Sequence, residues 1–218
     1  MATTEQPRRR TAAALKPSGG PDGNERLTAA TAVVLIVLLA ALGVTILSIG
    51  GLVWWHVLLG MLLIPPVLLK LGSTGWRFMR FYTGAREYVR RGPPLLALRL
   101  MAPLLVASTL AVFATGVALL AVGPQAGFVV GLHKASFIVW LVITALHVLA
   151  HVRAIPQLVT ADWRRRAVLP DDVVPGTGMR RLALVATIVV GAVIAAATIR
   201  YAQPWVHFFA SHRGHHDG

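Results

Sequence analysis

The sequence predicts an all-α integral membrane protein, a bundle of transmembrane helices. Of the 218 residues, 56% are hydrophobic and only 13% are charged, and the mean hydropathy is +0.69. This composition lies outside the usual range of soluble domains. The apolar residues are gathered into runs long enough to cross about 30 Å of bilayer hydrocarbon. They do not alternate with polar residues as the strands of a membrane barrel do, so helices are predicted.

Five apolar runs are long enough to form spanning helices, each of which needs about 20 residues. They cover residues 27–49, 52–71, 95–122, 127–152 and 180–202. The first run is too long for the apolar region of a signal peptide and has no clear cleavage site, so we expect it to be retained as the first span. The predicted membrane domain therefore covers residues 27–202, and its first four spans form a four-helix core.

Both ends of the chain are predicted to lie outside the membrane domain. Residues 1–26 are rich in Arg, Pro and Gly and have no apolar stripe, which predicts a disordered cytoplasmic tail. Residues 203–218 contain four of the eight histidines, namely His207, His212, His215 and His216. We expect this segment to be a polar extracytoplasmic terminus, and a metal-binding tail is the alternative.

The basic residues predict the orientation of the spans. Of the 21 lysines and arginines, 18 lie in the N-terminal segment and around the connections between spans two and three and between spans four and five. The other side holds Lys134, Arg200 and Arg213. Because basic loops near span ends resist translocation, we predict a multi-pass protein of the plasma (inner) membrane with its N-terminus in the cytoplasm and its C-terminus outside. The net charge of +13 lies in these connections and forms no basic groove with interleaved aromatics, so no nucleic-acid partner is expected.

The sequence lacks the residues that several kinds of catalytic or metal site require. The chain has no cysteine, which excludes disulfides, thiolate metal sites and a cysteine nucleophile. The predicted spans contain no Asp or Glu, and no hydrolase triad, phosphate loop or H-E-x-x-H motif occurs. The missing carboxylates also disfavour a proton-driven transporter. These absences disfavour a stand-alone catalyst.

Four histidines lie within the predicted spans, where ionisable groups are costly and usually functional. His56 in the second span and His133 in the fourth are predicted at nearly the same depth on the external side. If these helices are neighbours, the two imidazoles can approach a flat group from opposite sides, as six-coordinate iron in a b-type haem requires. For His151, near the cytoplasmic end of the fourth span, an interfacial position is an equally good interpretation.

A second, inner site is supported only in part. His147 follows His133 by fourteen residues, which at about 100° per residue returns to within about 40° of the same direction, about 21 Å along the axis. That spacing suits two haems, one above the other. The same step from His56 leads to Lys70, where a fourth histidine would be needed. One haem b is therefore expected and a second stays open, while depth disfavours a single haem between His56 and His147.

Three interpretations of the inner site remain open. His147 pairs with a ligand that the sequence does not identify, or it forms a quinone or proton pocket with His151, or Lys70 neutralises a haem propionate. Arg99 is a further candidate for a propionate or a quinone headgroup. Snorkelling to the interface explains Lys70 and Arg99 equally well.

Two other features bear on the core. Pro65 and Pro66 remove backbone donors and predict a kink in the second span. Trp140 lies about midway between His133 and His147. We expect it to pack in the core, with a place beside a haem as the alternative.

Two segments resemble a known family. "HVLLGMLLIPPVLLKL" at 56–71 and "GLHKASFIVWLVITALHVLAHV" at 131–152 resemble the cytochrome b membrane subunits of the bacterial b561-like group, notably those that accompany molybdopterin oxidoreductases in actinobacteria. The resemblance covers roughly residues 30–155. It implies haem b and electron transfer between the quinone pool and an extracytoplasmic oxidoreductase subunit, with His56, His133 and His147 associated with haem iron. The chain departs from it by lacking an evident fourth histidine.

Two other functions compete with the cytochrome. A non-haem transporter or an assembly scaffold is the main alternative, although the odd number of spans and the unlike halves show no inverted repeat that would favour transport. A divalent metal carrier would need several ligands around one ion. The fourteen-residue step holds His133 and His147 too far apart for that.

Overall fold

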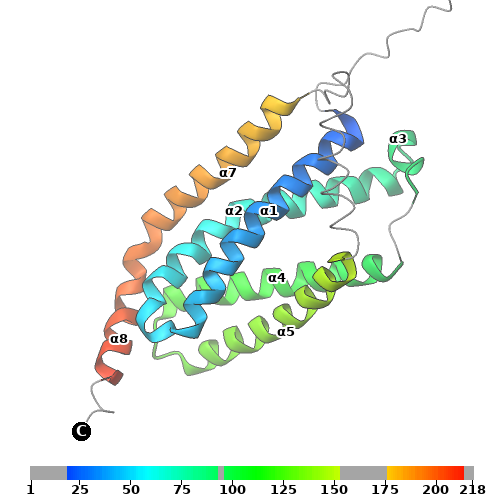
Figure 1. Cartoon of the computed structure of the whole chain (residues 1–218). Coiled ribbons are helices and arrows are strands. Elements are labelled where there is room, and N and C mark those ends of the chain that lie inside the picture. The colour runs from blue at the N-terminus through cyan, green and yellow to red at the C-terminus, as the bar shows by residue number, and fades with distance from the viewer. Residues whose placement is uncertain (1–18, 93–95, 153–175, 214–218) are drawn as a thin grey trace, which may run out of the picture.

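The computed structural model describes residues 19–92, 96–152 and 176–213 (Figure 1). The regular elements in these ranges are all helical. They are α1 (Gly20–Leu47), α2 (Ile49–Tyr82), α3 (Arg86–Val89), α4 (Leu96–Val122), α5 (Gly127–Val152), α7 (Thr177–Thr198), the 3-10 helix η1 (Ile199–Ala202) and α8 (Gln203–Arg213). The described ranges contain five helices that are long and apolar enough to cross a membrane: α1, α2, α4, α5 and the run from α7 into α8. The predicted all-α, multi-pass membrane fold is confirmed.

The helices differ from the predicted spans mainly at their ends. α1 begins at Gly20, inside the segment expected to be a disordered tail, because Pro21 and the acidic Asp22 in its first turn favour a helix start. α2 continues to Tyr82, past the predicted end at residue 71. The expected polar C-terminal tail contains helix α8. The predictions for residues 1–18, for the basic segment containing Arg153, Arg164, Arg165 and Arg166, and for His215 and His216 lie outside the described residues.

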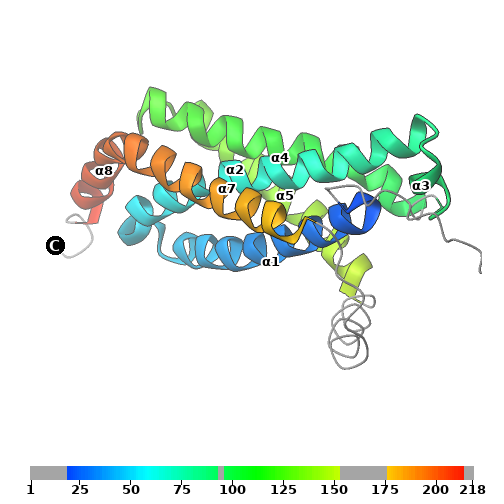
Figure 2. The ribbon, with the colours of Figure 1, turned by 90° about the horizontal axis from the view of Figure 1, so that it is seen from above.

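The long helices form two hairpins and a covering helix. Figures 1 and 2 show the α1–α2 hairpin between α7 and the α4–α5 hairpin. α2 packs along α1 and along α7 and touches α4, whereas α5 makes close backbone contacts with α4 and with no other helix in the described part of the chain. The turn at Ser48, the turn at 123–126 and α8 lie at one end of the bundle, which we call the α8 end, and α3 lies at the other, the α3 end.

The α2–α7 contact is built on the two prolines of α2. The helix continues through Pro65 and Pro66, both of which are buried, so the predicted kink does not interrupt it. Because Pro66 has no N–H, the Leu62 carbonyl lacks the donor it would have in a regular helix. Gly191 of α7 lies against that carbonyl so closely that an added Cβ would overlap the oxygen and stand 3.2 Å from the carbonyl carbon. A glycine at this position therefore lets the two backbones touch.

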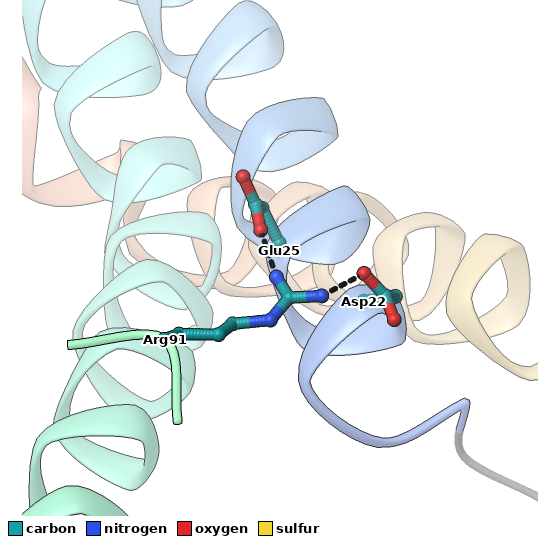
Figure 3. Close-up of polar contacts among 3 residues, drawn as sticks. All are labelled: Asp22, Glu25 and Arg91. Carbon is teal, nitrogen blue, oxygen red and sulfur yellow. Dashed lines mark hydrogen bonds and ion pairs between the residues drawn. The ribbon is translucent and has the colours of Figure 1, made fainter. Parts of the chain in front are cut away.

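An ion-pair cluster ties the α3 end together (Figure 3). Arg91, just after α3, binds Asp22 and Glu25 of α1, the latter with Nη1 2.7 Å from Oε2. The hydrogen bond to Asp22 raises the pKa of Arg91 above its ordinary value. The contribution of Arg91 to the free energy of unfolding is therefore present throughout the ordinary pH range, and it would be lost only as the pH rises through the raised pKa.

We expect the substitution Arg91→Gln to lower the stability in detergent by only about 0.2–1 kcal/mol, because the cluster is largely exposed and screened by water. The loss should shrink between low salt and about 1 M salt and should not vary between about pH 6 and about pH 9. Thermal unfolding at two salt concentrations measures it, with the exposed Arg90→Gln as control. A loss that is independent of salt would contradict an electrostatic role.

Candidate functional site

His56 of α2 is held by a hydroxyl of the preceding helix. Its Nδ1 lies 2.9 Å from Oγ1 of Thr45, and the imidazole is half-buried. Thr45 is buried near the end of α1, and its hydroxyl donates to the Leu42 carbonyl at 2.5 Å. The tight turn at Ser48 folds α2 back along α1, and this brings the two side chains together.

His133 of α5 is held in the same way by the other hairpin. Its Nδ1 lies 3.0 Å from Oγ1 of Thr115 on α4. The imidazole packs on Gly116, where an added Cβ would stand 3.2 Å from Cε1, so the missing side chain makes room for the ring. The half-buried His133 is thus held by a hydroxyl of α4 and packs on the backbone of the same helix.

The two histidines lie at similar levels of the bundle. His56 follows the turn at Ser48 by eight residues, and His133 follows the turn ending at Ala126 by seven, which correspond to about 12 Å and about 10 Å of helix. Both turns are at the α8 end (Figure 1). The structure therefore brings these two predicted residues to the same region, one from each hairpin.

His147 shares a face of α5 with His133. The less exposed side chains of this helix include His133, Trp140, Thr144 and His147, while the flanking Leu146 and Val148 are exposed. Trp140 Nε1 donates to Thr109 Oγ1 of α4 at 3.1 Å, so this side chain contacts the neighbouring helix. The buried Oγ1 of Thr144 has no hydrogen-bond partner within the described residues.

Lys70 and Arg99 lie away from the His56–His133 pair, toward the α3 end. Lys70 Nζ donates to the Thr28 carbonyl of α1 at 2.8 Å, and its position is about 21 Å along α2 from His56. Arg99 donates to the Tyr82 hydroxyl and stands 5.4 Å from the centre of that ring. Both side chains thus join neighbouring helices. His151 is in the last turn of α5, and its side chain lies outside the described part.

The C-terminal histidines belong to a packed helix. Trp205 of α8 is buried, and its Nε1 donates to the Leu119 carbonyl of α4 at 3.3 Å. His207 and His212 are exposed, and His212 Nδ1 donates to the Phe208 carbonyl at 2.7 Å. Across residues 19–92, 96–152 and 176–213, no three His, Cys, Asp or Glu side chains are grouped to hold a metal ion.

Sequence reasoning missed Thr45 and Thr115. Both side chains donate to carbonyls three or four residues earlier in their own helices, a common way of accommodating a hydroxyl in an apolar helix. The available signal was their position, because Thr45 lies three residues and Thr115 eight residues before a turn, and each of these turns is followed by a histidine. Seen alone, either threonine is an ordinary helix residue.

Comparison with protein-family models, with curated proteins and with solved structures gave no match to this chain.

Proposed function

We propose that the chain is a membrane cytochrome in which His56 and His133 would hold the iron of one haem b. It passes electrons between the membrane quinone pool and a redox partner on the extracytoplasmic side. The observation that supports this is the arrangement of two half-buried imidazoles, one from each hairpin, at one end of the bundle, each with its Nδ1 held by a threonine.

The residues present fit a porphyrin iron. Six-coordinate haem iron takes two imidazoles on opposite faces of the macrocycle, so the helices that supply them must stand apart. In the described residues α5 has no close backbone contact with α1 or α2, although α5 and α2 carry the two histidines. The buried Thr144 hydroxyl, which has no hydrogen-bond partner among the described residues, lies on the same face of α5 as His133.

In this proposal each part of the chain has a distinct task. When bound, haem supplies one-electron redox chemistry. His56 and His133 would each offer Nε2 to the iron, while Thr45 and Thr115 hold the Nδ1 atoms of the two rings. The apolar side chains of the spans keep water from the site. Since the site lies toward the α8 end, a soluble partner at that end is nearer to it than one at the α3 end.

The proposal is tested first on the purified protein. We expect the full-length chain in detergent, produced in cells supplied with a haem precursor, to show a reduced-minus-oxidised difference in the Soret and α bands and about one haem per chain. A colourless preparation that also fails to bind added haemin would overturn the proposal. Reduction of the haem by a quinol in membrane vesicles tests the quinone role separately, since a haem that quinol does not reduce would remove that role alone.

The proposed orientation gives a further prediction. The chain has no cysteine, so a single introduced one reports its own position. We expect Gln125→Cys, exposed at the α8 end, to react with a membrane-impermeant maleimide added to intact cells, and Arg86→Cys, exposed at the α3 end, to react only after the cells are opened. The reverse pattern would place the α8 end in the cytoplasm.

A further inference from the structure

We infer that Thr45 and Thr115 are positioning residues that select one tautomer of His56 and His133, with the proton on Nδ1 and a free lone pair on Nε2. A neutral imidazole has one N–H, and a ring nitrogen binds a metal only through a lone pair. Both threonines contact Nδ1. The inference rests on the proposed function where it concerns iron, but the tautomers follow from the hydrogen bonds alone.

The hydrogen of Thr45 is already used. A hydroxyl has one hydrogen to donate, and that of Thr45 goes to the Leu42 carbonyl at 2.5 Å. In its contact with His56, the Thr45 oxygen must therefore accept. The donor is then the imidazole, which places the proton of His56 on Nδ1.

The same count of donors and acceptors applies to the hydroxyl of Thr115. Its hydroxyl lies 2.8 Å from the Ala111 carbonyl and 3.1 Å from the Val112 carbonyl, and neither of these oxygens can donate. Ser136 Oγ, 3.1 Å away, uses its own hydrogen on the His133 carbonyl at 2.9 Å. Thr115 thus has acceptors for its hydrogen apart from the imidazole, and its oxygen accepts the proton on Nδ1 of His133.

The two contacts make matched outer shells for the proposed site. An acceptor on the far nitrogen of a metal-bound imidazole fixes the orientation of the ring and makes the ligand more basic. A more basic ligand stabilises the oxidised iron more than the reduced iron. Loss of the hydroxyl should therefore raise the midpoint potential as well as weaken haem binding.

The test compares Thr45→Val and Thr115→Val, which keep the side-chain shape, with Thr45→Ser and Thr115→Ser, which keep the hydroxyl. We expect each valine variant to weaken haem binding about 10- to 100-fold. We expect the potential to rise by about 59 mV for each tenfold change in the oxidised-to-reduced equilibrium. The serine variants should restore both quantities. Thr187→Val is the matched control, because Thr187 donates to the Leu184 carbonyl in the same way in α7.

A second measurement separates this inference from the proposed function. In protein with ¹⁵N-labelled histidine, we expect His56 and His133 to carry their proton on Nδ1 and each valine variant to change that signal. If the wild-type protein binds no haem, the proposed function fails and the tautomer measurement still decides the inference. If the wild type binds haem but the valine variants keep its potential and its affinity, or the protons are found on Nε2, the inference is wrong and the cytochrome stands.

Discussion

The variants His56→Ala and His133→Ala are each expected to be purified without haem. Loss of an outer-shell partner costs about 10- to 100-fold in metal affinity, and loss of the ligand itself should cost more. The two imidazoles come from different hairpins, so neither hairpin can replace the ligand that the other has lost. Haem per chain after detergent purification and the reduced-minus-oxidised spectrum measure the effect.

Two controls make this result specific. His207→Ala changes an exposed histidine of α8 and should leave the haem content at the wild-type level. His147→Ala changes a histidine on the same face of α5 as His133, about 21 Å away. Since the proposed pair is His56 and His133, this variant should keep the haem. If His147→Ala lost the haem while His133→Ala kept it, the pairing would be wrong and His147 would be the partner of His56.

The substitution Gly191→Ala is expected to destabilise the protein by about 1–3 kcal/mol, the usual range for overpacking. The added Cβ would overlap the Leu62 carbonyl oxygen, and backbone cannot rotate aside as a side chain can. The helices α2 and α7 must therefore separate, and Ala195, which is buried one turn after Gly191 in α7, loses packing. Thermal unfolding in detergent, followed by circular dichroism, measures the change.

Gly178→Ala is the matched control, because Gly178 lies in the same helix and a Cβ there would meet nothing within 4 Å. Its expected effect is neutral or stabilising by up to about 1 kcal/mol, since alanine favours helix more than glycine does. Equal melting temperatures for Gly191→Ala and Gly178→Ala would show that the contact with Leu62 does not hold α7 in place.

The fold could be predicted almost completely from apolar run lengths. The predicted span at 95–122 ends at the same residue as α4, and the predicted span at 127–152 begins at the same residue as α5, because Gly123 and Pro124 interrupt the apolar pattern between them. The predicted second span ends at residue 71, whereas α2 continues to Tyr82. The last turns of α2 carry aromatic and basic side chains, which lower the mean hydropathy and therefore predict a loop there. α1 starts before the predicted span because Pro21 and Asp22 favour a helix start in a stretch with few apolar residues, and the ion pairs of Asp22 and Glu25 with Arg91, distant in sequence, could not be predicted.

The site was less predictable, since a sequence gives spacing but not partners. Helical phase correctly placed His133 and His147 on one face, because that depends only on residues of a single helix. It could not show that Lys70 binds the Thr28 carbonyl, or that Arg99 binds Tyr82, because those contacts join different helices. Thr45 and Thr115 were missed for the same reason.

The proline-freed carbonyl of Leu62 also sets the register between α2 and α7. In a bilayer, lipid tails are as apolar as the helix surface, so hydrophobicity alone does not fix the axial position of one helix relative to its neighbour. A slide of α7 by one turn in either direction would bring Thr187 or Ala195 to this oxygen, and each carries the Cβ that Gly191 lacks. The missing hydrogen bond in α2 thus fixes the position of α7 along the axis of its neighbour.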